Sequence, residues 1–231
     1  MIARSRVLLL LVLALFLGPG CSNQQEPSPL TSIMAQAMTS IRGPSVKVPP
    51  IIPQNGFLAV SPQLVAAEKN LVVGVVLEAR NAQALLTPSG QRENLTTWLS
   101  ADRSSFTFIG GTVLVRTSGL GNDLQNAEFA QLLTVMASGL SGSTQRTHVY
   151  LTRDFQQERK IFACDVTPMG RAEIRISDQS FSTMRFEEAC RNEAEQFTNV
   201  YWLDVRTGLA VQSIQWIHTN TGYAHFQVIN N

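Results

Sequence analysis

The chain has 231 residues, of which 44% are hydrophobic and only 15% are charged, and its formal net charge is +1. This length and composition are typical of one globular domain with an extra segment, or of two small domains, and not of a disordered chain. A nearly neutral chain without clusters of Lys and Arg lacks the positive surface that binds nucleic acid, so we exclude that class of protein.

Residues 1–20 have the pattern of an export signal. Arg4 and Arg6 precede an uninterrupted apolar run over residues 7–17, and small residues then lead to Cys21. This run is too short to cross a bilayer of about 30 Å as a helix. The segment resembles a bacterial lipoprotein signal peptide, and the alternative is an ordinary secreted protein cleaved nearby.

The lipoprotein resemblance implies that Cys21 is acylated, with palmitate among its acyl chains, and becomes the N-terminus. Several acyl chains together anchor a domain stably, because each buried CH2 contributes about 0.8 kcal/mol. Ser22 after the lipidated cysteine implies the outer membrane, with the domain on the periplasmic side. We expect no transmembrane helix from this segment.

Residues 21–55 are expected to be a lipid-anchored tether. The stretch after Cys21 is polar and contains prolines, which favours a flexible linker. Apolar residues then recur at helical spacing from Leu30 to Ile41, which predicts a short amphipathic helix that docks on the domain or rests on lipid. A proline-rich linker over residues 44–53 leads to a β domain that we place at residues 56–231.

The β domain is predicted to be all-β, an antiparallel barrel or barrel-like sandwich with one or two short helices. Short runs of alternating apolar and polar residues follow one another, separated by turn residues, and closure of such a sheet removes its edges. One strand is expected to end at the turn over residues 87–90. Apolar spacing predicts one helix from Phe129 to Leu140, and residues 186–197 are ambiguous between a helix and a loop with solvent-facing charges.

The stretch from Thr198 to Trp216 predicts an antiparallel hairpin around which the rest of the chain is organised. Two runs rich in β-branched and aromatic residues flank the polar group at residues 204–208. Both faces of these strands are apolar, so the hairpin should lie inside a larger sheet. The apolar pattern changes parity near Gln212 and Ser213, which predicts a β-bulge there.

Cys164 and Cys190 are predicted to form a disulfide. They are the two cysteines that remain when Cys21 is acylated, and the periplasm is an oxidising compartment. The alternative is two buried free thiols. We expect no metal site and no cofactor at these cysteines, since no pair of histidines lies nearby to complete a ligand set. His218 and His225 likewise have no obvious third ligand.

The sequence contains no familiar catalytic motif. Gly119 and Gly121 lack the third glycine of a dinucleotide-binding loop, and neither a Gly-x-Ser-x-Gly nor a His-Glu-x-x-His pattern occurs. We therefore predict that the protein is not an enzyme. A polysaccharide hydrolase remains the alternative, because two carboxylates could act as acid and base. The candidates for such a pair are Asp102, Asp123, Asp165 and Asp204.

Three stretches of the chain resemble the YjbF/GfcB-type group 4 capsule polysaccharide lipoproteins. They are residues 110–124, which read GGTVLVRTSGLGNDL, residues 161–164, which read IFAC, and the hairpin residues from Tyr201 to Trp216. The resemblance runs from about the lipid anchor to the C-terminus. It implies a mostly β, barrel-type periplasmic domain on an outer-membrane lipoprotein associated with capsule or exopolysaccharide assembly and export. It supplies no catalytic residues.

An accessory role of this kind requires a surface for polysaccharide or for other capsule or exopolysaccharide assembly proteins. Aromatic rings can stack on sugars while Arg and Asp bind hydroxyls. The candidate contacts are Arg116, Asp123, Tyr201, Trp202 and Trp216. The alternatives are that the aromatic residues belong to the core and that Arg116 and Asp123 form an ion pair at a corner. A purely structural envelope protein is a further alternative.

Overall fold

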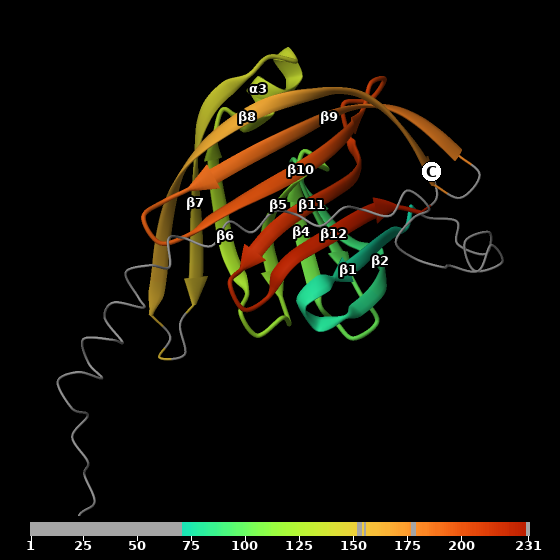
Figure 1. Ribbon diagram of the computed structural model, residues 1–231. Coiled ribbons are helices and arrows are strands. Elements are labelled where there is room, and N and C mark those ends of the chain that lie inside the picture. Colours follow the sequence, from blue (N-terminus) through green and yellow to red (C-terminus); the bar gives the residue numbers. More distant parts are fainter. Residues whose placement is uncertain (1–70, 152–153, 155, 177–178, 230–231) are drawn as a thin grey trace, which may run out of the picture. The chain divides into compact units, whose positions relative to one another are not determined.

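The computed structural model describes residues 71–151, 154, 156–176 and 179–229 (Figure 1). The predicted signal peptide, Cys21 and the tether lie outside the described residues. The elements are β1 Val73–Leu77, the 3-10 turn η1 Glu78–Arg80, β2 Ala82–Arg92, β3 Leu95–Leu99, β4 Ser105–Ile109, β5 Val113–Ser118, β6 Leu124–Ala130, α3 Leu132–Ser138, β7 Gly142–Leu151, β8 Gln157–Ile176, β9 Gln179–Arg191, β10 Gln196–Asp204, β11 Ala210–His218 and β12 Gly222–Val228.

All these strands form one 12-stranded sheet in the order β5-β4-β3-β2-β1-β12-β11-β10-β9-β8-β7-β6. Every neighbouring pair is antiparallel, including β1 with β12, which joins the two ends of the described chain. The two edge strands, β5 and β6, follow each other in the sequence, so the sheet curls back on itself as a nearly closed barrel (Figure 1). The predicted antiparallel barrel is confirmed.

Side chains complete the hydrogen bonding at the edge strand β5. Gln215 of β11 reaches across the barrel, accepting from Leu114 N at 2.8 Å and donating to Thr112 O at 2.9 Å. On the side toward β6, Arg116 donates to Gln125 O at 3.0 Å. A buried strand edge without such partners would leave costly unpaired backbone groups.

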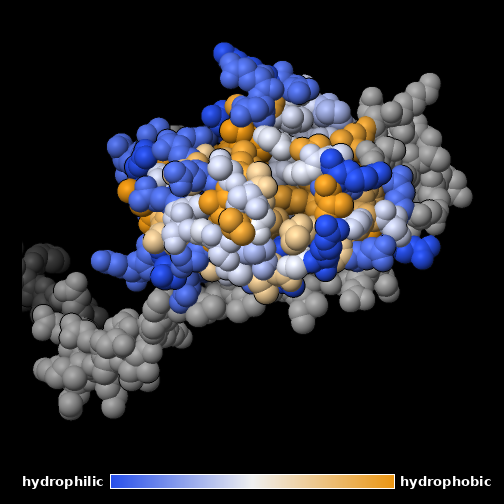
Figure 2. Space-filling view, turned by 90° about the horizontal axis from the view of Figure 1, so that it is seen from above, coloured by the Kyte–Doolittle hydropathy of each residue, from blue (hydrophilic) through white to orange (hydrophobic). Residues whose placement is uncertain are grey.

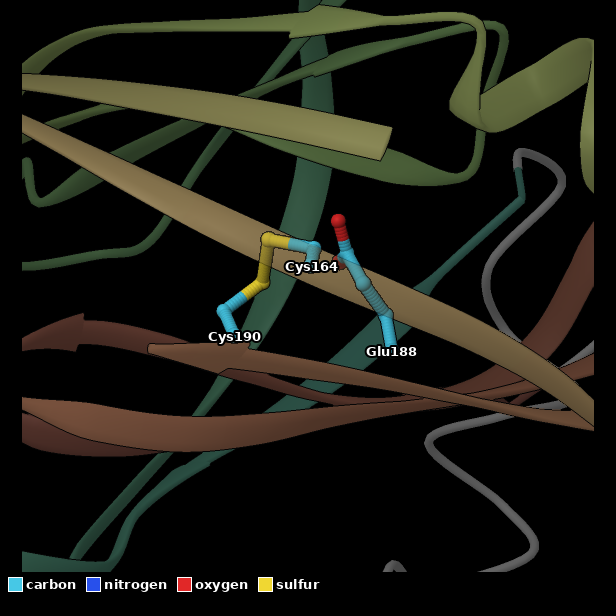
Figure 3. A group of neighbouring side chains, drawn as sticks. All are labelled: Cys164, Glu188 and Cys190. Carbon is cyan, nitrogen blue, oxygen red and sulfur yellow. A yellow bond between two sulfur atoms is a disulfide. The ribbon is translucent and has the colours of Figure 1, made fainter. Parts of the chain in front are cut away.

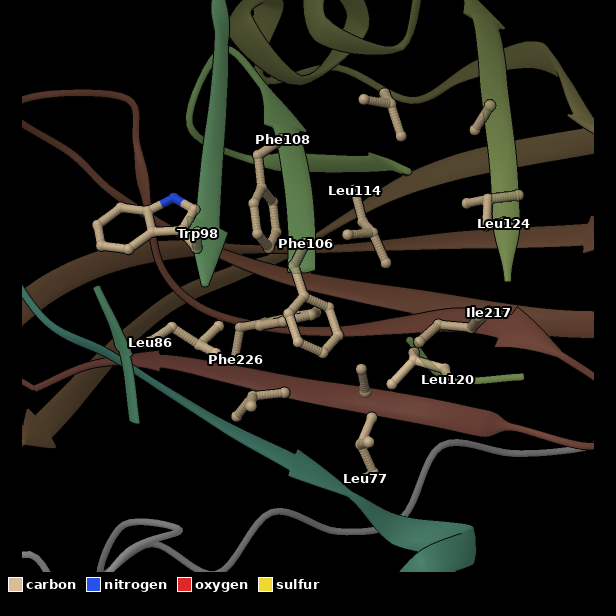
Figure 4. Packing of buried hydrophobic residues seen from close by; sticks show 14 of the residues in the cluster. Leu77, Leu86, Trp98, Phe106, Phe108, Leu114, Leu120, Leu124, Ile217 and Phe226 are labelled. Carbon is tan, nitrogen blue, oxygen red and sulfur yellow. The ribbon is translucent and has the colours of Figure 1, made fainter. Parts of the chain in front are cut away.

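The apolar side chains form a layered core. One cluster fills the interior between β1–β5 and β12, and its aromatic members Phe106 and Phe108 meet Phe226 edge-on at centroid distances of 5.4 and 4.8 Å (Figure 4). A second cluster joins Leu132 and Met136 of α3 to the inner face of β8–β10. Helix α3 thus packs on the sheet.

The hairpin of β10 and β11 lies at the centre of the sheet, and both strands are buried on both faces. Trp202 pairs with Gln212 whereas Leu203 pairs with Ala210, so Val211 is an extra residue. The predicted β-bulge is therefore confirmed, one residue earlier than expected. A bulge redirects the side chains that follow it, which explains the change of apolar parity along β11.

Three local predictions are corrected by long-range pairing. β2 does not stop at residues 87–90 but continues to Arg92, because a register shift between Pro88 and Gly90 accommodates the proline. The ambiguous segment 186–197 is mostly strand, since β9 and β10 pair along their length. The predicted helix from Phe129 is shorter than expected, because β6 pairs with β7 through Ala130.

Helix α3 ends at Gly139, where φ is +70°. It has seven residues, and among the described residues no helix has the length and apolarity needed to traverse a lipid bilayer.

Candidate functional site

A cavity of about 400 Å³ lies at the end of the barrel where the β4–β5 turn meets the β10–β11 loop. Ala210 N donates to Thr112 Oγ1 at 3.2 Å, which ties the loop to the start of β5. Gly111 of the turn has a φ of +63°, and a Cβ built there would lie 3.3 Å from Leu209 of the loop. We call this space the mouth cavity. Its volume falls in the range of about 300–1,000 Å³ that is usual for small-molecule sites.

The walls of the mouth cavity are largely aromatic and aliphatic. Trp98, Phe108 and Phe226 come from the interior core cluster, and their neighbouring positions are visible in Figure 4. Val73 of β1 and Phe181 of β9 add to these walls. Together they make much of the lining apolar, so that part of the wall offers few hydrogen-bonding partners.

Polar side chains surround this apolar part at the loop and at the strand ends. Arg206 lines the cavity with 74% of its side chain exposed, and its Nη2 lies 3.4 Å from Asp204 Oδ2. Gln91 and Thr96 of paired strands also line it. Because Asp204 offsets the one cation among the described lining residues, the rim is nearly neutral.

Asp204 holds the β10–β11 loop in place. Its carboxylate accepts from Arg206 N at 2.8 Å and from Thr207 N at 3.1 Å. Burial alone would raise the pKa of this carboxyl, but the two backbone donors and Arg206 outweigh burial and hold the pKa below its ordinary value of 3.8. Asp204 is therefore a structural anion of the loop at neutral pH.

Gln212 also belongs to the cavity lining, and 4% of it is exposed. It pairs with Gln227 of β12, while its neighbour Ser213 pairs with Phe226. Because side chains alternate along a strand, the Gln212 side chain lies on the sheet face opposite Phe226. Gln212 therefore does not face the aromatic wall of the cavity.

A second polar cluster lies away from the mouth and is saturated. Arg146 of β7 donates to both carboxylate oxygens of Glu188 in β9, at 3.1 and 2.7 Å. Tyr201 accepts from Arg146 at 3.1 Å and donates to Glu188 at 3.0 Å, while Asn199 donates to Glu188 at 2.8 Å. Arg146 is 2% exposed and Glu188 not at all. The expectation that the charges of segment 186–197 face solvent is wrong for Glu188.

The charges of this cluster stabilise one another. Burial by itself would lower the pKa of Arg146, but the carboxylate of Glu188 outweighs burial and raises it. Burial raises the pKa of Tyr201 well above 10.0, and Glu188 adds to that effect. Arg146 and Tyr201 therefore each keep one protonation state at physiological pH, which suits a structural role and not acid–base catalysis.

The predicted disulfide between Cys164 and Cys190 is present and lies beside this cluster (Figure 3). The two cysteines are directly opposite in the β8–β9 ladder. Both sulfur atoms lie within 4.8 Å of a Glu188 oxygen. Because the sulfurs are bonded to each other, neither is a thiolate that could bind a metal in this group.

The predicted aromatic contacts are in the core. Tyr201 belongs to the polar cluster and is 0% exposed. Trp202 is 9% exposed with the Arg185 guanidinium 5.4 Å from its ring, and Trp216 is covered by Phe197 and other neighbours. Their burial favours the alternative that these aromatic residues belong to the core, and their contact with a glycan stays a prediction.

Arg116 and Asp123 lie at the corner between β5 and β6, apart from the aromatic rings. Asp123 accepts from Thr117 Oγ1, Gly119 N and Leu120 N at 3.0–3.2 Å, which locks the corner. Arg116 is exposed and donates to Gln125 O of β6. Among the described residues, no ion pair joins Arg116 to Asp123. Their contact with a glycan or partner remains a prediction.

Apart from Asp204, the sequence analysis did not single out the residues that line the mouth cavity. Trp98 and Gln212 are far apart in the chain, and nothing in either local pattern indicates that they line one space. Gln212 is not a distinguishing signal either, because β11 also carries Ser213 and Gln215 at buried positions.

Surface apolar residues also gather near this end of the molecule. Leu209 of the β10–β11 loop is 49% exposed, and Leu140 after α3 is 67% exposed. Seen from above, the surface shows apolar side chains among groups of strongly hydrophilic ones (Figure 2). Exposed apolar residues at a cavity rim are typical of a ligand or partner site.

The nearly closed barrel with its helix matches a solved structure. The hypothetical lipoprotein YmcC from Escherichia coli K12 has a solved structure that matches with a TM-score of 0.64 and 14% sequence identity, over 89% of this chain and 97% of that chain. Identity this low shows the fold alone. Comparison with the curated proteins gave no match.

The family follows from the sequence itself. Residues 53–229 match the family described as group 4 capsule polysaccharide lipoprotein gfcB, YjbF, and the chain belongs to this family. The predicted resemblance is thereby confirmed.

Proposed function

We propose that the protein is an accessory factor, and not an enzyme, in the assembly or export of a capsule or exopolysaccharide. Acyl chains on Cys21 anchor it to the outer membrane on the periplasmic side. The observation that carries this proposal is membership of the capsule polysaccharide lipoprotein family over residues 53–229. The order of a signal-like segment, a tether and a disulfide-bonded β domain supports an extracytoplasmic location.

The β domain acts by binding a glycan-bearing component or a neighbouring assembly protein. The mouth cavity supports this role, because it is large enough for a ligand and combines apolar walls with a polar rim. Its rim includes the exposed Leu209 and Arg206, which are available to a partner. Arg116 and Asp123 offer a second, smaller contact surface at the β5–β6 corner.

The distribution of carboxylates favours a binding role over hydrolysis. Among the described residues that line the mouth cavity, Asp204 alone is acidic, and it is occupied by the loop backbone. Asp123 holds the β5–β6 corner, Asp102 accepts from Ser104 N, and Asp165 pairs with Arg191. A glycosidase needs two carboxyl groups that converge on one bond. These aspartates are each committed elsewhere.

Deletion of the gene in its own host tests the role. We expect the deletion strain to carry less polysaccharide on its surface. The wild-type gene should restore the polysaccharide, whereas a gene with Cys21→Ser should not. The Cys21→Ser protein should also fail to incorporate labelled palmitate and should be missing from the outer-membrane fraction. Normal surface polysaccharide in the deletion strain contradicts the proposal. Crosslinking to protein neighbours only, with no effect on polysaccharide, supports a purely structural envelope protein instead.

Incubation of the host polysaccharide with the purified protein separates the binder from the hydrolase. We expect the polysaccharide to keep its size distribution and to gain no new reducing ends. Shortened chains, lost in the Asp204→Asn variant, would establish the hydrolase.

A further inference from the structure

We propose that the barrel end opposite the mouth cavity is closed by an acid-sensitive latch, in which His148 of β7 must stay uncharged. The latch consists of His148, Tyr150, Lys160 and Glu195. Strand β10 connects the two ends, since it begins next to Glu195 and ends at Asp204 in the lining of the mouth cavity. This inference goes beyond the proposed function and does not depend on it.

His148 is enclosed by aromatic rings inside the barrel, and none of its surface is exposed. Phe197 of β10 stacks on the imidazole with a distance of 5.5 Å between ring centroids. Phe162 of β8 meets it edge-on, also at 5.5 Å. A positive charge at this position would have no water around it, and burying a charge without a partner is costly.

The hydrogen bonds of the ring fix its tautomer. The Tyr150 hydroxyl donates its one proton to Ile217 O at 2.6 Å. His148 Nδ1 lies 2.9 Å from the same hydroxyl oxygen, so Nδ1 carries a proton and donates it to that oxygen. Nε2 is therefore the unprotonated nitrogen, and it is buried without a hydrogen-bond partner among the described residues. A second proton would bind at Nε2, where no described acceptor receives the new N–H.

Two cations beside the ring oppose this second proton. Arg146 precedes His148 by two residues on the same face of β7, and Lys160 lies directly opposite His148 in the β7–β8 ladder. The Lys160 ammonium is 5.6 Å from the centroid of the Tyr150 ring. Burial, together with the charges of Arg146 and Lys160, lowers the pKa of His148 well below its ordinary value of 6.5.

The carboxylates around this end are already paired with those cations. Glu188 of β9 accepts from Arg146 at 2.7 Å, and Glu195 accepts from Lys160 at 2.8 Å. Glu158 of β8 lies 3.6 Å from the same ammonium. A charged His148 would thus compete with Arg146 and Lys160 for anions that these cations already hold.

The remaining neighbours supply no counter-charge either. On β6 the residue opposite His148 is Ala127, and on β10 it is the stacked Phe197 that covers the ring. His218 of β11 meets the Tyr150 ring edge-on at 4.8 Å. Burial and Lys160 lower the pKa of His218, while Glu195 opposes that shift. Its protonation in acid would add a further positive charge to this end.

Acid should therefore open the latch. Because the folded pKa of His148 lies below 6.5, the unfolded or opened chain binds the proton more tightly, and the stability falls as the pH falls below about 6.5. Strand β6 is an edge strand, so opening of β6 and β7 breaks only the ladder between β7 and β8 and exposes His148. The carboxyl of Asp204 keeps its charge down to a pH below 3.8, which leaves the mouth loop in place.

Hydrogen exchange of the full chain, read by mass spectrometry between about pH 7 and about pH 5, tests the latch. After correction for the intrinsic exchange rate, the opening constant of β6 and β7 should rise about tenfold for each pH unit below about 6.5. His148→Phe keeps an aromatic ring against Phe197 but cannot titrate, so it should abolish this rise. His218→Phe is the matched control at the same end and should keep most of it, because His218 is only half-buried.

The same pH dependence in wild type and His148→Phe would overturn the proposal. If His148→Phe does not fold, nitrogen NMR of the wild-type histidines decides the outcome. Nδ1 of His148 should carry the proton and Nε2 should stay bare in the folded protein at about pH 5. A folded protein with a proton on Nε2 at that pH would refute the latch. Failure leaves the proposed function standing, because the deletion phenotype is measured separately.

Discussion

The Glu188 cluster and the mouth cavity differ in how side chains fill the space around them. At Glu188, Arg146 of β7 and Tyr201 and Asn199 of β10 form a hydrogen-bonded network with the β9 carboxylate, and the disulfide lies alongside. At the mouth, Trp98, Phe108 and Phe226 line a cavity of about 400 Å³, and its rim residues Arg206 and Leu209 are exposed. Saturated networks fix a structure, whereas an apolar cavity with a polar rim is typical of a binding site. The contrast separates the part of the barrel that holds the fold from the part that can bind.

The largest expected effect comes from the charge of the saturated cluster. Glu188→Gln leaves the guanidinium of Arg146 buried without a counter-charge, which should lower the free energy of unfolding by about 3–5 kcal/mol. Urea denaturation measures this, with Glu173→Gln on an exposed position of β8 as control. The double variant Arg146→Met, Glu188→Leu should recover most of the loss. A loss for Glu188→Gln no larger than for the control would show that the cluster does not hold the fold.

The disulfide should contribute slightly less. Cys164 and Cys190 are 26 residues apart, and closing such a loop stabilises the folded state by about 3–4 kcal/mol in the chain-entropy model. Replacing both cysteines with alanine should reduce the unfolding free energy by this amount, as should reduction of the wild type. Reductant should leave the alanine variant unaffected. Equal stability of oxidised and reduced wild type would contradict the expectation.

At the mouth, the anion of Asp204 should matter in a pH-dependent way. Asp204→Asn weakens the hydrogen bonds to the loop backbone and should cost about 2 kcal/mol at pH 7. Because the folded pKa lies below 3.8, this stability is present above that value and is lost as the pH falls through the folded pKa. Thermal unfolding from pH 7 to pH 2 should show the gap between wild type and variant closing below about pH 4. A gap that stays constant would refute the role of the charge.

The smallest effect is expected at the turn beside the cavity. Gly111 has a φ of +63°, so Gly111→Ala should cost about 1 kcal/mol and press on Leu209. Gly90→Ala is the matched control, since Gly90 has no atom within 4 Å of an added Cβ and no positive φ. Its midpoint should stay close to that of wild type. Equal changes in the two variants would mean that the turn is not constrained by its conformation.

The fold could be predicted where local signals decide the structure. The hairpin over residues 198–216 is specified by β-branched and aromatic residues around a polar loop, and it forms as expected, with its bulge at Val211. Gly139 ends α3 because its φ is positive. The disulfide was predicted because two cysteines remain after Cys21 and the expected compartment is oxidising. The β8–β9 ladder places Cys164 directly opposite Cys190.

The candidate site could not be predicted, because it depends on contacts that are remote in sequence. Glu188 was expected in solvent because its neighbours are charged, and its partner Arg146 is 42 residues away. Trp202 and Trp216 were candidate contacts for a glycan, whereas Trp98 lines the cavity from a strand with no distinctive pattern. Alternation along a strand predicts which residues share a face, but not which faces meet around a cavity.

Complementation of the deletion strain with cavity variants tests the central claim most directly. The account predicts that Thr96→Trp, expressed and folded, fails to restore surface polysaccharide, while Thr97→Trp restores it to the wild-type level. Full restoration by Thr96→Trp would show that the mouth cavity has no part in the function of this lipoprotein.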